Sequence, residues 1–195
     1  MRAIFLDRDG VLNENRADYV KSCQEFVWLS GSLKALAMLA ARDVQIIVVT
    51  NQSMVGRGVV MPTVLDDIHH RMREEAAAQG GRIDAVYACL HAPADACLCR
   101  KPLPGLLHRA AADHRLDLAQ SLLIGDAFTD YQAATAAHMR YIHVRSGGGA
   151  ADSDRVAAAD HSVSIVANLL AAVPLCAPEP VRQVPTTHSP QDACG

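Results

Sequence analysis

The sequence predicts an α/β fold in which a parallel sheet is covered by helices on both faces. Short, largely apolar runs of strand length alternate with longer segments of helical periodicity. Such alternation favours right-handed crossovers between parallel strands, so the runs are expected to form one sheet. The chain has 195 residues, enough for one well-buried domain.

Five runs are expected to be strands, at residues 3–6, 44–49, 85–88, 121–124 and 141–144. Helical patterns lie between them at 32–41, 63–79, 104–114 and 130–138. Pro62 and Pro104 stand near two helix starts, where proline costs little. The SGGGA run at 146–150 has no following Lys-Ser/Thr, so we interpret it as a flexible connector after the last strand.

We expect a single domain over residues 1–175. Residues 13–29 lack clean periodicity and are predicted to form a flap beside the end of the first strand. The segment 176–195 is rich in proline and polar residues, which is typical of a disordered tail.

Composition excludes several classes of protein. A net charge of −3 gives no electrostatic reason to bind nucleic acid or an anionic membrane. No apolar run approaches the roughly 20 residues that span a bilayer. The charged stretch from Asp7 to Asp9 interrupts the apolar start too early for a signal peptide. A cytoplasmic enzyme or binding protein is therefore expected.

Polar residues end three of the predicted strands: Asp7 and Asp9, then Thr50 and Asn51, then Asp126. Since parallel strands end at one edge of the sheet, these side chains are expected to converge there. Two neighbouring carboxylates raise each other's pKa unless a cation offsets their charge, and Mg²⁺ suits oxygen ligands. A turn acid with a helix cap is the alternative for an isolated DxDG. The other two polar strand ends favour a site.

Asp130 follows Asp126 by one helical turn and is expected to be a further ligand or a support for the ligands.

The stretch CLHAPADACLCRKP places Cys89, His91, Cys97 and Cys99 at C-x-H and C-x-C spacings. Three thiolates and an imidazole form a closed tetrahedral Zn²⁺ site of the structural type. The alternative is a set of ordinary buried cysteines beside a surface histidine, but the spacing favours a metal.

The remaining cysteines have no partner at ligand spacing. We interpret Cys23 as a small buried apolar residue, and Cys176 and Cys194 as incidental thiols near the tail. Two adjacent histidines, His69 and His70, lie on a predicted helix, and we interpret them as part of a solvated helix face.

The segments DRDGVLN, VVTNQ, RKP and GDAFTD, taken in order, resemble the four motifs of haloacid dehalogenase (HAD) superfamily phosphatases. This resemblance covers about residues 1–145. In having the cysteine loop and no large cap insert, the sequence resembles one branch of the superfamily, the D,D-heptose 1,7-bisphosphate 7-phosphatases and histidinol phosphatases. The segments TNQSMVGRG and CxHxPxxxCxCRKPLPG resemble the heptose enzymes more closely.

The resemblance implies a role for each motif residue. Asp7 would be the nucleophile that forms an aspartyl-phosphate, and Asp9 the general acid and base. Thr50 would hydrogen-bond the transferring phosphoryl group, and Lys101 would neutralise charge on it and on the nucleophile. Asp7, the backbone carbonyl of Asp9, and Asp126 would hold Mg²⁺.

The resemblance also implies that the flap, the TNQS and GRG segments and the Arg-Lys pair contact the substrate. These positions are Asp18, Tyr19, Val20, Asn51, Gln52, Ser53, Arg57 and Arg100. Two positions depart from the family pattern: Met54 stands where glycine is frequent, and Ala127 where many members have a cation.

The leading hypothesis is a monomeric, Mg²⁺-dependent phosphatase acting on the 7-phosphate of D-glycero-D-manno-heptose 1,7-bisphosphate, on the route to nucleotide-activated heptose. Histidinol phosphate or another small phosphomonoester is the first alternative substrate. A non-catalytic binding module is a second alternative, against which the complete set of motif residues counts. A phosphotransferase or mutase is a third, although residues 13–29 are too few for the lid it would need.

Overall fold

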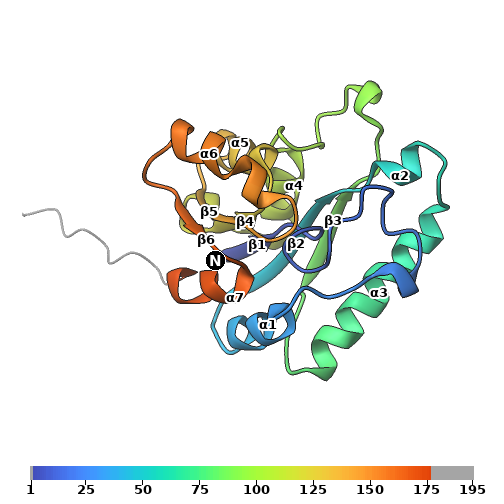
Figure 1. Ribbon diagram of the computed structural model, residues 1–195, viewed down its shortest axis with the longest axis horizontal. Helices are drawn as coiled ribbons and strands as arrows, with labels where there is room; N and C mark the ends of the chain where they lie inside the picture. The colour runs from blue at the N-terminus through green and yellow to red at the C-terminus, as the bar shows by residue number, and fades with distance from the viewer. Residues whose placement is uncertain (1, 177–195) are drawn as a thin grey trace, which may run out of the picture.

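The computed structural model describes residues 2–176. These residues form a six-stranded, wholly parallel sheet between two layers of helices (Figure 1). The strands stand in the order β3-β2-β1-β4-β5-β6. The predicted α/β fold class is confirmed.

The strands are β1 (Ala3–Leu6), β2 (Gln45–Asn51), β3 (Ala85–Cys89), β4 (Leu122–Gly125), β5 (Arg140–Val144) and β6 (Ser164–Val166). The first five lie at the predicted apolar runs, with ends that differ by at most two residues. β6 was not predicted. It has three residues, lies at the sheet edge and is partly exposed, and its apolar residues Ile165 and Val166 are too few to form a run of strand length.

The helices are α1 (Ser32–Ala40), α2 (Ser53–Gly56), α3 (Pro62–Ala78), α4 (Gly105–His114), α5 (Phe128–Ala136), α6 (Gly149–Ala159) and α7 (Leu169–Ala172). The 3-10 turns are η1 (Cys23–Glu25), η2 (Pro93–Asp95), η3 (Leu118–Gln120) and η4 (Val173–Cys176). The interpretation of residues 146–150 as a connector after the last strand was wrong, because α6 begins inside the run and β6 follows it. The many small and polar residues of α6 hid its apolar face.

The continuous apolar character of β1 follows from burial on both sides. Ile4 and Leu6 pack into the layer formed with α1, α3 and α7, whereas Ala3 and Phe5 pack into the layer with α4, α5 and α6. All four side chains are at most 3% exposed. Alternate residues of a strand point to opposite faces, so a strand between two helix layers has no place for a polar residue.

The chain order reverses between β1 and β4. β2 and β3 extend the sheet on one side of β1, and β5 and β6 extend it on the far side of β4 (Figure 1). The backbone N–H of Asp7 donates to the carbonyl of Ile124 at 3.0 Å and so ties the two strand ends together. A site in an open parallel sheet forms at such a reversal, outside the carboxyl ends of the strands.

Residues 13–29 lie beside the end of β1, where the backbone N–H of Glu14 donates to the carbonyl of Val27. Helix α3 holds this segment with two polar contacts. Trp28 Nε1 donates to Glu75 Oε2 at 2.6 Å, and Arg71 Nη1 donates to the carbonyl of Cys23 at 2.7 Å. The segment is therefore anchored on a helix that is itself part of the core.

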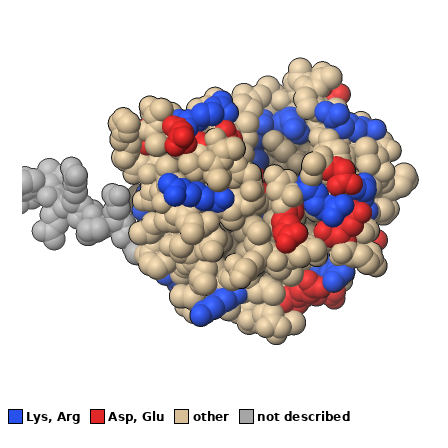
Figure 2. Space-filling view, viewed as in Figure 1, with Lys and Arg blue, Asp and Glu red and all other residues tan. Residues whose placement is uncertain are grey.

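The predicted tail lies outside the described residues except for Cys176, which ends η4 and donates from Sγ to the carbonyl of Ala172. On the face shown in Figure 2, basic and acidic side chains are interspersed and neither sign forms a continuous patch. Among the described residues, no helix is long and apolar enough to cross a membrane.

A matched pair of substitutions in α1 tests which side chains support the core. Leu36 is fully buried and Met38 is 44% exposed. We expect Leu36→Ala to lower the free energy of unfolding by about 2–5 kcal/mol because it leaves a cavity. Met38→Ala should change it by no more than about 0.5 kcal/mol. Urea denaturation of both variants measures the difference, and equal losses would contradict the two-layer core.

Candidate active site

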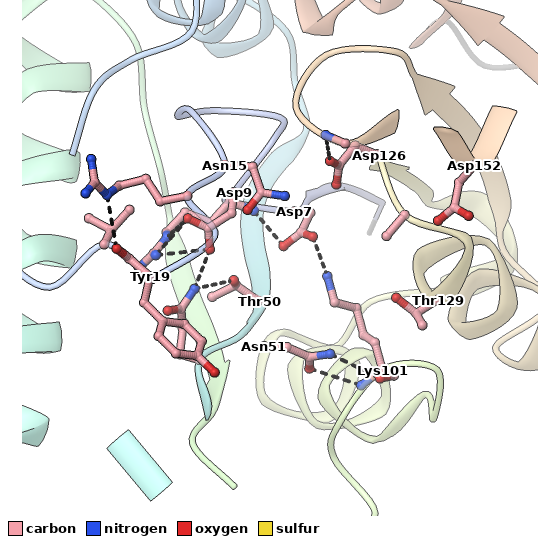
Figure 3. A pocket seen from close by; sticks show the side chains of 16 residues that line it. Asp7, Asp9, Asn15, Tyr19, Thr50, Asn51, Lys101, Asp126, Thr129 and Asp152 are labelled. Carbon is pink, nitrogen blue, oxygen red and sulfur yellow. Dashed lines mark hydrogen bonds and ion pairs between the residues drawn. The ribbon is translucent and has the colours of Figure 1, made fainter. Parts of the chain in front are cut away.

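The structure brings the five predicted motif residues to one cavity of about 350 Å³ at the strand reversal (Figure 3). They are Asp7, Asp9, Thr50, Lys101 and Asp126. The other lining residues are Arg8, Asn15, Arg16, Tyr19, Val20, Asn51, Gln52, Ala127, Thr129, Gly148 and Asp152.

Lys101 is buried at the centre of this arrangement. Its Nζ lies 2.9 Å from Asp7 Oδ2 and 2.6 Å from Asp130 Oδ1, and it donates to the carbonyl of Val49 at 3.0 Å. Burial alone would lower the pKa of Lys101, but the carboxylates of Asp130 and Asp7 raise it above its ordinary value. The ammonium group is therefore a permanent charge that connects the ends of β1 and β2 with α5.

Three carboxylates share that single positive charge. Oxygens of Asp7, Asp126 and Asp130 lie within 4.8 Å of one another, and all three residues are buried. Burial raises the pKa of Asp7 to about 7, with Lys101 opposing the shift. Burial and the charges of Asp7 and Asp130 raise the pKa of Asp126 to about 8. A hard divalent cation with oxygen ligands would balance the excess negative charge, so the donor set fits such an ion.

The backbone around Asp126 leaves no spare room. Gly148 N donates to Asp126 Oδ2 at 2.9 Å, and Ser146 Oγ donates to the carbonyl of Gly10 at 2.7 Å. Gly10 has a φ of +82°, and a Cβ there would lie 2.0 Å from Asp126 Oδ2. Ser146 and the glycine run at 147–149 thus form an ordered wall of the site, which the interpretation as a connector missed.

The side chains that contact Asp9 differ from those that contact Asp7, although only one residue separates the two acids. Arg8 Nη2 contacts both oxygens of Asp9, at 2.9 and 3.0 Å. Asn13 Nδ2 and Gln52 Nε2 donate to Asp9 at 2.9 and 2.6 Å. Burial raises the pKa of Asp9, but Arg8, Asn13 and Gln52 together lower it below its ordinary value.

Side chains after β2 connect the two halves of the cavity. Gln52 Nε2 donates to Thr50 Oγ1 at 2.9 Å as well as to Asp9. The side-chain amide of Asn51 exchanges two hydrogen bonds of 3.1 Å with the backbone of Lys101. Asn51 therefore fixes the loop that carries the central cation, in addition to lining the cavity.

Of the other predicted substrate contacts, Tyr19 and Val20 line the cavity and Asp18, Ser53, Arg57 and Arg100 do not. Ser53 is buried and contacts the Tyr19 hydroxyl, with the two oxygens 3.4 Å apart. Asp18 is exposed and pairs with Arg16 and Lys21. Arg57 is exposed on the loop after α2.

Arg100 lines a neighbouring hollow beside the cysteine loop. Substrate contact stays a prediction for all eight positions.

Several residues that line the cavity or contact its acids were not predicted. Arg8 and Asn13 surround Asp9, and the signal was present in the sequence as polar residues one and four positions from that acid. Asn15 and Arg16 reach the cavity from the flap, while Thr129 and Asp152 reach it from α5 and α6. The last two are fixed by packing of helices over the sheet, which no local pattern records.

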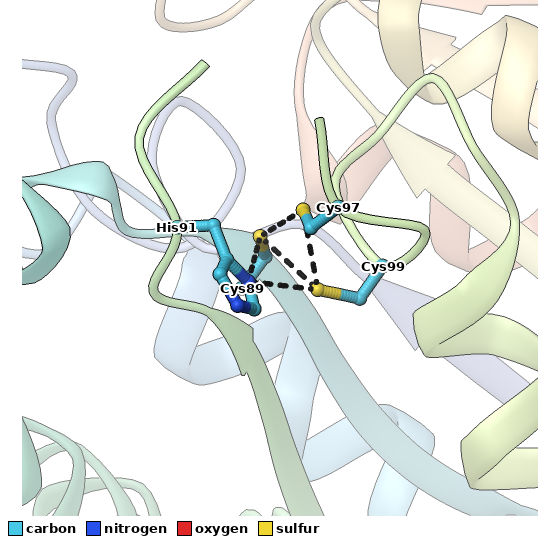
Figure 4. A group of neighbouring side chains, drawn as sticks. All are labelled: Cys89, His91, Cys97 and Cys99. Carbon is cyan, nitrogen blue, oxygen red and sulfur yellow. Dashed lines mark hydrogen bonds between the residues drawn. The ribbon is translucent and has the colours of Figure 1, made fainter. Parts of the chain in front are cut away.

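Cys89, His91, Cys97 and Cys99 form a compact cluster at the end of β3 (Figure 4). The three sulfur atoms lie 3.3–3.6 Å apart, and His91 Nδ1 is 3.3 Å from Cys99 Sγ and 3.7 Å from Cys89 Sγ. A zinc tetrahedron with Zn–S bonds of about 2.3 Å has edges of roughly 3.8 Å. The cluster is thus compatible with a zinc-binding site.

The thiols of this cluster differ in acidity. Desolvation raises the pKa of Cys97, but the backbone N–H of Arg100 and the neighbouring thiols bring it to about 7. Burial and the other two thiols raise the pKa of Cys99 to about 12. Three thiolates cannot coexist here without a cation, and a bound metal would supply it.

A pair of glycine substitutions tests the fit between Gly10 and Asp126. Gly10 and Gly58 both have positive φ, but a Cβ on Gly58 would meet nothing within 4 Å. Gly58→Ala should cost only the roughly 1–2 kcal/mol of the left-handed conformation. Gly10→Ala must also displace the Asp126 carboxylate, so we expect a larger loss of stability and no rise of Tm when Mg²⁺ is added. Indistinguishable behaviour in thermal melts with and without Mg²⁺ would contradict this fit.

Comparisons with known proteins agree with this geometry. A family model described as HAD-hydrolase-like matches residues 98–172. A Bordetella bronchiseptica protein named D-glycero-beta-D-manno-heptose-1,7-bisphosphate 7-phosphatase is 42% identical over 76% of this chain and 83% of its own. A Mycobacterium tuberculosis protein named as the phosphatase of the alpha anomer is 36% identical over 77% of this chain and 84% of its own.

A solved structure of the D,D-heptose 1,7-bisphosphate phosphatase from B. bronchiseptica, complexed with magnesium and phosphate, superposes with a TM-score of 0.83. It is 36% identical and the match covers 90% of this chain and 97% of that one. With a shared fold and relatives matched over most of their length, the chain belongs to the heptose-1,7-bisphosphate 7-phosphatase family of HAD-type phosphatases.

Proposed function

We propose that the chain hydrolyses the 7-phosphate of D-glycero-D-manno-heptose 1,7-bisphosphate through an aspartyl-phosphate, with Mg²⁺ as cofactor. The observation that carries the proposal is the buried carboxylate of Asp7, which shares Lys101 with Asp130 and lies beside Asp126 in the cavity. The names of the relatives supply the substrate class. We expect the protein to act on this small phosphosugar as a cytoplasmic monomer.

In this proposal an oxygen of Asp7 attacks phosphorus while the bond from phosphorus to the sugar oxygen breaks. Asp9 must hold a proton for this step, although Arg8, Asn13 and Gln52 lower its pKa, and it passes that proton to the leaving oxygen. Water then attacks phosphorus in the aspartyl-phosphate and gives its proton to Asp9, which releases phosphate and restores Asp7. Asp7 and Asp9 both line the cavity but face different cationic side chains, Lys101 and Arg8, so the two roles fall on separate carboxylates.

The ammonium group of Lys101 is already in place to support the attack. This group lies 2.9 Å from Asp7 Oδ2, where it opposes the rise that burial causes in the pKa of Asp7 and would offset charge on the transferring group. Thr50 presents a hydroxyl to the same cavity and would hydrogen-bond the phosphoryl oxygens, with Asn51 and Gln52 fixing the loops on either side. Tyr19 and Val20 of the flap would line the sugar.

Mg²⁺ would be held by the carboxylates of Asp7 and Asp126 and by the backbone carbonyl of Asp9. When bound, the ion counters negative charge on the phosphoryl oxygens. The excess of carboxylates over cations around Asp126 supports this assignment. Zn²⁺ on the cysteine cluster would have a structural role, because its four protein ligands leave no open position. Since Lys101 follows Cys99 by two residues, the ion would help to fix the loop that carries this lysine.

Substitution of the nucleophile tests the mechanism. We expect Asp7→Asn to lower Mg²⁺-dependent phosphate release from heptose 1,7-bisphosphate on the order of 10³-fold or more, because an amide cannot form the intermediate. The matched control is Asp66→Asn on the exposed side of α3, which should retain activity. Full activity of Asp7→Asn would contradict the assignment.

A comparison of substrates tests the specificity. The wild-type protein should release one phosphate per heptose 1,7-bisphosphate and leave the 1-phosphate in place, at a higher kcat/KM than with histidinol phosphate. The assay runs both anomers, because relatives named for each anomer resemble the chain. A clear preference for histidinol phosphate would retain the mechanism and overturn the substrate.

Loss of ligands tests the zinc site. We expect close to one zinc per chain by elemental analysis, lost in Cys97→Ser/Cys99→Ser together with thermal stability, because metal binding orders the loop. Cys23→Ser removes a thiol far from this cluster in sequence and should retain the metal. If the double variant keeps both its zinc and its melting temperature, the proposal that this cluster binds zinc and orders the loop is contradicted.

A further inference from the structure

Arg8, between the two acids of the first motif, is among the most deeply buried side chains of the protein. It is 0% exposed, and its backbone N–H donates to Asp7 Oδ1 at 2.7 Å. Its guanidinium turns to Asp9, with Nη2 on both carboxylate oxygens and Nε 3.3 Å from Oδ1. A planar guanidinium fixes the plane of the carboxylate it contacts in this way.

The opposite edge of the guanidinium faces helix α3. Arg8 Nη1 lies 3.2 Å from Nε2 of His69. Arginine has only donors, so His69 Nε2 must accept and the ring must carry its proton on Nδ1. Burial, and then the charge of Arg8, lower the pKa of His69 to about 3, with Asp9 opposing the shift, so the imidazole stays neutral in the working range. The reading of this histidine as part of a solvated face was wrong; only His70 is exposed.

We propose that His69 is a positioning residue for the proton-transfer steps, because it fixes the Arg8 guanidinium that orients the carboxylate of Asp9. This inference rests on the proposed function. The contacts run in one line from α3 through His69 and Arg8 to Asp9. Each link is a hydrogen bond between half-buried or buried groups.

The physical reason is the cost of an unpaired donor. A buried N–H without an acceptor is destabilising, and a guanidinium that loses the acceptor on one edge rotates toward any other. Asp9 itself accepts from Asn13 and Gln52 as well, so it would be retained in the cavity after such a rotation. Its oxygens would nevertheless point differently relative to the leaving group, and proton transfer depends steeply on that geometry.

The same helix anchors the flap through Arg71 and Glu75. Through His69 the helix contacts the guanidinium that holds the acid/base carboxylate, and through Arg71 it contacts the flap that contains Tyr19. A general loosening of α3 would disturb the two together. Loss of the His69 acceptor alone should disturb only the first.

The test compares His69→Phe, which keeps the ring and removes the acceptor, with His69→Gln, which supplies an acceptor of similar reach. His70→Phe, on the exposed neighbour, is the matched control. Each variant is assayed with heptose 1,7-bisphosphate and, in a rapid-mixing experiment, with p-nitrophenyl phosphate. The nitrophenolate leaving group needs no proton, so its first-turnover burst reports attack by Asp7 without help from Asp9.

We expect His69→Phe to lower kcat for the sugar bisphosphate roughly 10- to 100-fold with KM nearly unchanged, and to leave the nitrophenolate burst within about 3-fold of wild type. His69→Gln should recover most of the activity, and His70→Phe should match wild type. Should His69→Phe not fold, His69→Asn replaces it, since its shorter side chain withdraws the acceptor while remaining polar.

Equal losses on the two substrates, or no rescue by His69→Gln, would overturn the proposal. Asp9→Asn separates this outcome from failure of the proposed function. If Asp9→Asn selectively lowers sugar-phosphate turnover and His69→Phe does not, the acid/base assignment stands and His69 has no part in it. If Asp9→Asn has no selective effect, the acid/base assignment itself fails, and the positioning role fails with it.

Discussion

The site depends on one buried cation. Lys101 places its ammonium group between Asp7, Asp130 and the carbonyl of Val49, and so joins residues that follow or end different strands. A charge at this depth is stable only with carboxylates around it, and those carboxylates are stable together only with a cation. The charges are only partly balanced, because one ammonium group faces three carboxylates, those of Asp7, Asp126 and Asp130. The remaining negative charge is what a divalent ion would neutralise.

The same constraint gives two acids one residue apart different surroundings. Asp7 lies on the Lys101 side, where burial raises its pKa, and Asp9 turns to Arg8, Asn13 and Gln52, which lower its pKa. In Figure 3 Asp9 lies toward Tyr19 and the flap, whereas Asp126 lies on the other side of Asp7. Two separate cationic partners thus keep adjacent carboxylates from competing for one charge.

Much of the fold could be predicted because strands that are buried on both faces consist of consecutive apolar residues. Five of the six described strands were found in this way. β6 and α6 escaped prediction because an edge strand and a helix of small residues leave weak local signals. Asp7, Asp9 and Asp126 follow β1 and β4 closely and Thr50 lies near the end of β2, so topology brings these four together. Lys101 comes twelve residues after β3 and is placed by the loop that carries it. Arg16 and Asp152 could not be predicted, since their positions depend on how the flap and α6 pack over the sheet.

The central claim is that Asp7 forms a covalent phosphoryl intermediate. Its most direct test is to mix the protein with Mg²⁺ and heptose 1,7-bisphosphate, quench within the first turnover, and reduce with borohydride. Reduction converts an aspartyl-phosphate to homoserine, which peptide mass spectrometry locates. We expect homoserine at position 7, and only when substrate is present. Homoserine at another position, or none while phosphate is released in the same quenched sample, would contradict the account.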